Sequence, residues 1–387
     1  MLVGRKPSPN IFVTGGSGFL GSHFLCWARR IGRAAAVVLV RGPDDVGRKR
    51  KLIRACATAA QSYEAFSFDE LPQLTVVGGD VEKALCGLAP AKVSELRAAD
   101  IHEFWHFAAS LRYEANGWAT IIGRNVRGAE NAVRLAAALG ARRFVHVSTA
   151  YCVGAVEGLA REKPHQVARS FCNAYEASKC YEEHAILRVA AQHGLSTTIL
   201  RPSIVIGPQS TKRTGGSRIG LYGLLRELAS ARDLLSEHAP IRVPVRSEIE
   251  VNLIPVDCLM HDIREIVRNE FGPSMIYHLC AKHGPSVNAV FTALCAALKV
   301  DGLKLVSLSE PASPILDMMP ERMRFYAPYL RLDRRFERSL SGDWSISARD
   351  LAKFIMTARQ EVADPHAREM FQQFAARSIL PSGVLSH

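Results

Sequence analysis

A glycine-rich turn near the amino terminus constrains the fold of this chain more than any other feature. Gly15, Gly18 and Gly21 recur between a short apolar run at 11–13 and an apolar helical stretch at 23–28. In such a turn the first glycine permits the tight bend, the second lets backbone N–H groups approach a pyrophosphate, and the third lets helix and strand pack closely. A lone motif of this kind is often an ordinary turn. The flanking strand and helix favour the opening unit of a dinucleotide-binding fold, with phosphate at the helix N-terminus.

Apolar segments with the lengths of strands and helices alternate along the rest of the chain. Strands are expected at 11–13, 36–40, 74–77, 103–107, 143–147, 197–202 and 275–279, with helices between them, notably at 129–139 and 175–193. This alternation predicts an α/β fold, a doubly wound parallel sheet of the Rossmann type with a smaller, mostly helical substrate domain. The expected dinucleotide-binding domain comprises residues 1–207 plus 251–282, and the substrate-binding domain comprises 208–250 plus 283–387.

A tyrosine and a lysine four residues apart, Tyr175 and Lys179, indicate the candidate chemistry. On a helix, residues at i and i+4 stand on one face, so the ammonium would lie beside the phenol. This predicts a tyrosine pKa below its usual ~10 and a group that exchanges a proton with a carbonyl or carbinol oxygen. Ser148 and Thr149 close the fifth expected strand, whose carboxyl end faces the ligand in such sheets. Hydroxyl residues also occur at strand ends simply to satisfy backbone groups.

An arginine follows the second expected strand. At this position a site selective for NAD usually has an acidic residue for the ribose hydroxyl, whereas an arginine accommodates a 2′-phosphate. Arg41 is therefore the first candidate for NADPH selectivity, and Arg48 and Arg50 are secondary candidates. The run 48–51 is equally well interpreted as a solvated basic turn.

Together these motifs resemble the extended short-chain dehydrogenase/reductase superfamily. Within it they are most similar to the male-sterility-type branch, with fatty acyl-CoA reductases and the thioester-reductase domains of carboxylic acid reductases and peptide synthetases. The similar segments run in family order from about 11 to 260, at 14–21, 39–41, 79–81, 106–110, 147–151, 175–179, 201–207 and 254–257. The resemblance implies Thr149, Tyr175 and Lys179 as catalytic residues, with Ser148 as the less favoured hydroxyl, and NADPH/NADP+ as the cofactor.

The resemblance also implies which residues surround the cofactor. They are Thr14, Gly15, Ser17, Gly18, Phe19, Leu20, Arg41, Arg50, Asp80, Val81, Ala108, Ala109, Ser110, Asn125, Ser148, Tyr175, Lys179, Pro202, Ile204 and Val205. No metal is expected. The segment from His102 to His106 matches a zinc-protease pattern, but that pattern requires a helix. Here it falls on the fourth expected strand, where residues four apart are separated by ~13 Å, too far to share one zinc ion.

The expected activity is reduction of a carbonyl by NADPH, with Tyr175 donating a proton to the developing oxyanion and Thr149 hydrogen-bonding the same oxygen. The branch implies a fatty-acyl or carrier-bound thioester reduced to the aldehyde, or further to the alcohol. The alternative enzyme is an NADP-dependent ketone or alcohol oxidoreductase acting on a secondary metabolite. A sugar-nucleotide epimerase and a non-catalytic cofactor-sensing protein are less favoured, the latter because Tyr175 and Lys179 are both present.

Two later segments offer candidates for the substrate site. Leucines at 221, 224, 225, 228, 234 and 235 recur at roughly helical spacing, which fits either a core helix or a mobile apolar flap over 215–235 that closes on an acyl chain. The stretch 326–330, which contains two tyrosines and a leucine, fits either plain core or the lining of an acyl pocket.

Composition indicates the cellular compartment of the chain and the kind of partner that it binds. Its 387 residues are 48% hydrophobic and 22% charged, which is typical of a soluble enzyme, and no apolar run reaches the ~18–20 residues that cross a bilayer. Nine cysteines without Cys-x-x-Cys pairs, and no secretory signal, predict a cytoplasmic protein. The net charge of +12 favours anionic partners such as NADPH, acyl-CoA or an acyl carrier protein thioester. We expect no nucleic-acid partner and a monomer or homodimer.

Overall fold

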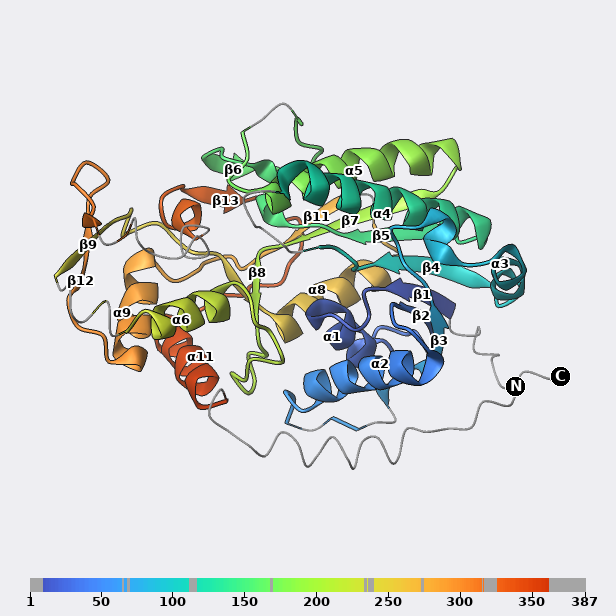
Figure 1. Ribbon diagram of the computed structural model, residues 1–387, viewed down its shortest axis with the longest axis horizontal. Coiled ribbons are helices and arrows are strands. Elements are labelled where there is room, and N and C mark those ends of the chain that lie inside the picture. The colour runs from blue at the N-terminus through green and yellow to red at the C-terminus, as the bar shows by residue number, and fades with distance from the viewer. Residues whose placement is uncertain are drawn as a thin grey trace.

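The computed structural model describes residues 10–361, except 65, 68–69, 111–116, 168–169, 233–234, 236–239, 273–274, 315 and 317–325. A parallel sheet of seven strands forms the centre of this described part (Figure 1). The strands are β1 (Asn10–Thr14), β2 (Ala35–Val40), β3 (Gln73–Gly78), β4 (Ile101–His106), β5 (Arg143–Val147), β7 (Ser196–Pro202) and β11 (Ile276–Leu279). All the strands predicted from the sequence are confirmed, and their ends differ by at most two residues.

The order of the strands determines where a ligand can bind. From edge to edge it is β11, β7, β5, β4, β1, β2 and β3, and every neighbouring pair is parallel. The chain runs outward from β1 through β2 and β3, then returns to place β4 on the other side of β1. Such a reversal opens a crevice outside the carboxyl ends of β1 and β4. The predicted doubly wound sheet of the Rossmann type is therefore confirmed.

Helices cover both faces of the sheet, because successive residues of a strand point to opposite faces. Val38 and Val40 of β2 are buried in one hydrophobic cluster, and Val37 and Leu39 in another. The first cluster includes α1 (Phe19–Trp27), α2 (Asp45–Ala60) and α8 (Val256–Arg268). The second includes α3 (Pro90–Arg97), α4 (Trp118–Ala138) and α5 (Ala174–Gln192). In Figure 1, α4 and α5 lie above the sheet, and α1, α2 and α8 lie below it.

A third hydrophobic cluster builds a smaller lobe at the left of Figure 1. Its elements are α6 (Leu221–Ser230), α9 (Val287–Leu298), α11 (Ala348–Glu361), β9 (Ile241–Pro244) and β12 (Leu303–Val306). Leu225 and Leu228 of α6 are buried inside this cluster, as in a core helix. Movement of the predicted flap stays a prediction. The division of the chain into two domains also stays a prediction, although this cluster draws its residues from 206–253 and 287–358.

Short elements complete the described chain. Two parallel strand pairs join distant segments: β8 (Ile204–Ile206) with β10 (Leu253–Pro255), and β6 (Gly158–Ala160) with β13 (Arg334–Phe336). Single turns of 3-10 type are η4 (Ala150–Val153) and η6 (Ala327–Leu330), and the short turn η2 (Ala84–Gly87) has Leu85 and Cys86 in the left-handed region. Among the described residues, no helix is long and apolar enough to span a bilayer.

The segment that matches the zinc-protease pattern is strand β4, as predicted. Its Glu103 carboxylate accepts hydrogen bonds from Arg33 Nε at 2.9 Å and from Trp105 Nε1 at 2.8 Å. Nδ1 of His106 lies 2.7 Å from the Thr14 hydroxyl on β1. The polar groups of this segment thus bind neighbouring elements of the fold. Within the ranges that the structure describes, no group of three or more His, Cys, Asp or Glu is arranged to hold a metal ion.

Candidate active site

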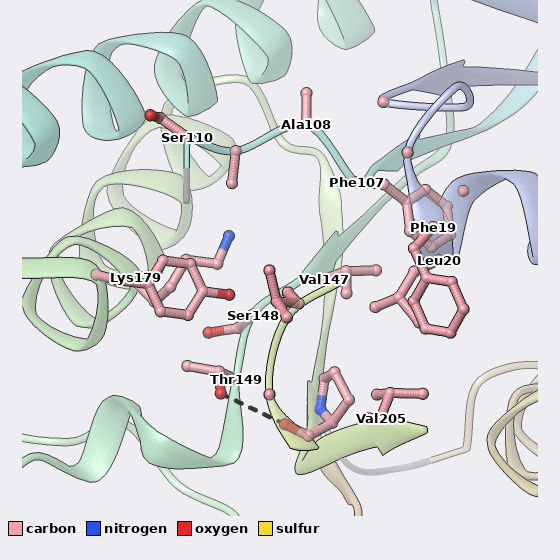
Figure 2. A pocket seen from close by; sticks show the side chains of 18 of the residues that line it. Phe19, Leu20, Phe107, Ala108, Ser110, Val147, Ser148, Thr149, Lys179 and Val205 are labelled. Carbon is pink, nitrogen blue, oxygen red and sulfur yellow. Dashed lines mark hydrogen bonds between the residues drawn. The ribbon is translucent and has the colours of Figure 1, made fainter. Parts of the chain in front are cut away.

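A cavity of about 910 Å³ lies at the carboxyl ends of β1, β4, β5 and β7 and extends to α6 and α9. Every catalytic and cofactor-binding residue predicted from the sequence lines it, with the exception of Arg48 and Arg50. Figure 2 shows part of this cavity, with Phe19, Leu20 and Val205 on one side and Lys179 on the opposite side. Residues that are far apart in the sequence therefore converge at the crevice that the strand order predicts.

The glycine-rich turn has the geometry that a dinucleotide requires. Gly15 has a positive φ of 72°, and a Cβ atom there would lie 2.5 Å from the backbone nitrogen of Ala108. A Cβ at Gly21 would lie 2.3 Å from the carbonyl oxygen of Gly15. Gly18 is the N-cap of α1 and provides no side-chain cap, so the first amides of the helix remain available to a phosphate. The turn thus fits the pyrophosphate of a nicotinamide dinucleotide.

Three cations line the end of the cavity beyond β2: Arg41, Lys51 and Arg124. Arg41 is 70% exposed and lies 3.9 Å from the carboxylate of Asp80 and 3.8 Å from that of Glu82. These long, exposed ion pairs hold the guanidinium weakly, so an incoming anion can compete for it. This end of the cavity therefore combines three cations with the carboxylates of Asp80 and Glu82.

The secondary arginines predicted from the sequence lie elsewhere. Arg50 is exposed on α2 and does not line the cavity, so the structure does not support its assignment to the cofactor. Arg48 Nη1 donates a hydrogen bond to the carbonyl oxygen of Gly42 at 2.6 Å, which stabilises the loop after β2. Sequence reasoning missed Lys51, which follows Arg48 by three positions. No signal in the sequence marked Lys51, because the face of α2 that meets the cavity depends on how this helix packs against β2.

Asn125 of α4 fixes the loop after β4. Its Oδ1 accepts a hydrogen bond from the Ser110 amide at 2.8 Å, and its Nδ2 donates to the Ser110 carbonyl at 3.1 Å and to Ser178 Oγ at 2.9 Å. The side chain is 6% exposed. Asn125 therefore joins the loop that carries Ala108 to Ser110 to the helix that carries Tyr175 and Lys179.

The two hydroxyl residues at the end of β5 differ in the hydrogen bonds that their side chains form. Ser148 Oγ donates a 2.5 Å hydrogen bond to Glu183, whose carboxylate is held by Arg201 at 2.6 Å. Burial opposes this charge, but Arg201 lowers the pKa of Glu183 to about 2. Thr149 Oγ1 makes two long hydrogen bonds: it donates at 3.4 Å to the carbonyl oxygen of Pro202, drawn as the dashed line in Figure 2, and accepts at 3.3 Å from the Tyr151 amide. The Thr149 hydroxyl is thus held less tightly than that of Ser148.

Tyr175 and Lys179 both face the cavity from α5, as their spacing predicted. The prediction of a lowered pKa for Tyr175 is wrong. Burial raises the pKa of Tyr175 above its ordinary value, and the Glu182 carboxylate raises it further. The Lys179 ammonium, which the prediction relied on, is paired with this carboxylate, because its Nζ lies 2.7 Å from Glu182 Oε2. Tyr175 is consequently a neutral phenol, which is the form that donates a proton.

The far arm of the cavity is mostly apolar. Leu221 and Leu224 of α6, Val290 of α9, and Tyr326 and Tyr329 line it. Tyr326 also belongs to the third hydrophobic cluster. The 326–330 stretch therefore is both part of the core and part of the cavity lining, the two roles that the sequence left open. Sequence reasoning missed Val290, because nothing in a helical apolar pattern distinguishes a cavity wall from ordinary core.

Arg334 of β13 secures the aromatic end of this arm. Its guanidinium lies 4.7 Å from the ring centre of Tyr151 and 4.9 Å from that of Tyr329. It also forms a 3.1 Å ion pair with Glu176, the residue after Tyr175. Tyr151 and Tyr329 both line the cavity. Their rings are therefore fixed to the helix that carries the catalytic candidates.

The fold and this site define a class of protein. A doubly wound sheet, a glycine-rich phosphate turn, and a threonine, a tyrosine and a lysine at its crevice characterise a nicotinamide-dependent oxidoreductase of the extended short-chain dehydrogenase/reductase type. Residues 13–263 match the family described as male sterility protein, and the chain belongs to that family.

Individual proteins resemble this chain over different lengths. It is 24% identical over 415 residues to the nonribosomal peptide synthetase asaC of Aspergillus flavus, with 98% of this chain and 38% of that protein covered. It is 26% identical over 287 residues to the L-2-aminoadipate reductase large subunit of Penicillium chrysogenum, with 68% and 18% covered. The terminal R domain from the myxalamid PKS-NRPS biosynthetic pathway shares the fold, with a TM-score of 0.72, 19% identity, and 94% and 93% covered. The chain therefore spans well under half of the length of these curated relatives.

Proposed function

We propose that this protein is an NADPH-dependent reductase that converts an acyl thioester, fatty-acyl or carrier-bound, into an aldehyde. The observation that carries the proposal is that Thr149, Tyr175 and Lys179 share one cavity with a phosphate-binding turn and an apolar arm. The similarity to a peptide synthetase and to an aminoadipate reductase supports a carrier-bound thioester as the substrate class.

The cations at one end of the cavity support NADPH over NADH. Arg41, Lys51 and Arg124 surround the region where the adenosine ribose would lie after β2. A 2′-phosphate would gain charge-assisted hydrogen bonds there, which are roughly twice as strong as neutral ones. Asp80 and Glu82 offset part of this positive charge, so the preference depends on the exposed Arg41 guanidinium turning from them to the phosphate.

The residues of this chain perform the proton transfers. When bound, the reduced nicotinamide supplies a hydride to the carbonyl carbon of the thioester. Tyr175 donates its proton to the carbonyl oxygen as negative charge develops there, and Thr149 hydrogen-bonds the same oxygen. In the hemithioacetal that results, the oxygen re-forms the C=O bond while the C–S bond breaks. The hydroxyl proton passes to sulfur, so the products are an aldehyde and a free thiol.

The test measures NADPH consumption and thiol release together, with octanoyl-CoA, with the same acyl group on a phosphopantetheinylated carrier protein, with a simple ketone, and without substrate. We expect equal amounts of NADPH consumed and thiol released with a thioester, and an aldehyde that hydrazine traps. Tyr175→Phe is the control for turnover at this site. NADPH consumption with the ketone but with neither thioester would contradict the proposal and would favour the ketone or alcohol oxidoreductase.

A further inference from the structure

Glu82, in the loop after β3, lies between two cations that reach the cofactor end of the cavity from different elements. Its Oε1 is 3.8 Å from Nη1 of Arg41, which follows β2, and its Oε2 is 3.5 Å from Nε of Arg124 on α4. All three residues line the cavity. The carboxylate therefore bridges two of the positive charges to which a 2′-phosphate would bind.

The neighbouring carboxylate of Asp80 has a different role. Its Oδ1 accepts a hydrogen bond from the Glu82 amide at 3.1 Å. The Asp80 amide donates to the Cys86 carbonyl oxygen at 2.8 Å, and the Asp80 carbonyl oxygen accepts from the Lys83 amide at 3.0 Å. These bonds fix the turn from which Glu82 projects. The Glu82 carboxylate itself is 40% exposed, and its contacts with the arginines are longer than ordinary hydrogen bonds, so it can move away at little cost.

The backbone at each arginine is anchored, while the guanidinium is exposed. Lys51 Nζ donates a hydrogen bond to the Arg41 carbonyl oxygen at 3.2 Å. Arg124 lies on helix α4, whose next residue, Asn125, binds the backbone of Ser110. The side chains of Arg41 and Arg124 are 70% and 46% exposed. A ligand can therefore redirect these two side chains without disturbing the loop or the helix that carries them.

We propose that Glu82 is a specificity-determining residue for the cofactor: its carboxylate pairs with Arg41 and Arg124 until a 2′-phosphate displaces it. This inference rests on the proposed function, in which these cations bind the 2′-phosphate of NADPH. NADH carries no phosphate there and leaves the carboxylate in place. Exposed ion pairs are individually weak, so the displacement lowers NADPH affinity by a modest factor and does not prevent binding. Glu82 thus reduces the preference for NADPH over NADH.

The experiment measures the Kd of NADPH and of NADH, from cofactor fluorescence, in wild type and in Glu82→Gln, which keeps the shape of the side chain but removes its charge. We expect NADPH to bind roughly 3- to 10-fold more tightly to the variant, as for the loss of two exposed ion pairs, and the Kd of NADH to change much less. Calorimetric titration with 2′-AMP and 5′-AMP isolates the phosphate, and 2′-AMP alone should gain affinity. An unchanged ratio of the NADPH and NADH Kd values would overturn the proposal.

Glu130→Gln is the matched control. Glu130 also bridges two arginines, Arg134 at 3.4 Å and Arg188 at 2.5 Å, but it lies outside the cavity. The substitution changes the net charge by the same amount and should leave the Kd values of both cofactors in place. An equal effect of Glu82→Gln and Glu130→Gln would reduce the result to net charge and refute a specific role for Glu82.

The Arg41→Ala background separates displacement from simple repulsion of the phosphate. If Glu82 acts by pairing with the arginines, Glu82→Gln should gain less NADPH affinity in Arg41→Ala than in wild type. A gain of the same size in both backgrounds would refute the pairing. A wild-type protein that binds 2′-AMP no better than 5′-AMP would instead contradict the proposed NADPH site. Failure of that site is therefore distinguishable from failure of the role of Glu82 alone.

Discussion

Replacement of Arg41 by alanine is the sharpest test of how this site selects its cofactor. The side chain is 70% exposed, and its ion pairs at 3.9 and 3.8 Å are long, so its loss should change the free energy of unfolding by less than ~0.5 kcal/mol. Loss of a charge-assisted hydrogen bond to the 2′-phosphate costs about 1.5–3 kcal/mol. Since about 1.4 kcal/mol corresponds to a tenfold change, NADPH should bind roughly 10- to 100-fold more weakly. Lys51 and Arg124 remain in the cavity, which places the expected value in the lower half of that range.

The assay compares the Kd of NADPH with that of NADH, from cofactor fluorescence, in wild type, Arg41→Ala and Arg50→Ala. Arg50 is the matched control because it has the same charge nine positions along the chain but lies outside the cavity. We expect Arg41→Ala to weaken NADPH alone and to reduce the salt dependence of its binding, since a phosphate contact is lost. Equal weakening of both cofactors, or an equal effect of Arg50→Ala, would show that Arg41 is not the selector.

Three further outcomes are expected. Tyr175→Phe should lower kcat by ~10²- to 10⁴-fold and leave NADPH affinity and Tm unchanged, because it removes only a proton donor. Near-normal turnover of this variant would show that Tyr175 is not the proton donor. Burial lowers the pKa of His23 from 6.5 to about 4, so its contribution to stability is complete above pH 6.5 and is lost as the pH falls towards 4. Urea unfolding across this window should show a smaller fall in His23→Asn than in wild type. For acyl-CoA substrates, kcat/KM should rise with chain length, by an amount that corresponds to up to ~0.8 kcal/mol of binding free energy per buried CH₂. Val290→Phe, which narrows the apolar arm, should shorten the preferred chain. A flat wild-type profile would exclude an acyl tunnel.

The fold was readable from the sequence because its signals are local. The apolar strands, the glycine turn and the intervening helices each depend on residues within about ten positions of one another, and the structure places all the predicted strands in one parallel sheet. The shared face of Tyr175 and Lys179 follows from the helical period alone. The convergence of Thr14, Ala108, Thr149 and Pro202 follows from the parallel strand order, which gathers carboxyl ends at one edge.

Tertiary packing decided what the local pattern could not. The sequence placed an ammonium beside Tyr175 and predicted a lowered pKa. The fold instead buries the phenol, which raises that pKa, and places the Glu182 carboxylate against Lys179, which raises it further. Whether a basic residue of α2 reaches the cavity depends on how that helix is rotated against β2, which brought Lys51 to the cavity and left Arg50 exposed. A charge acts over the few ångströms that packing sets, whereas the sequence specifies only residue type and spacing.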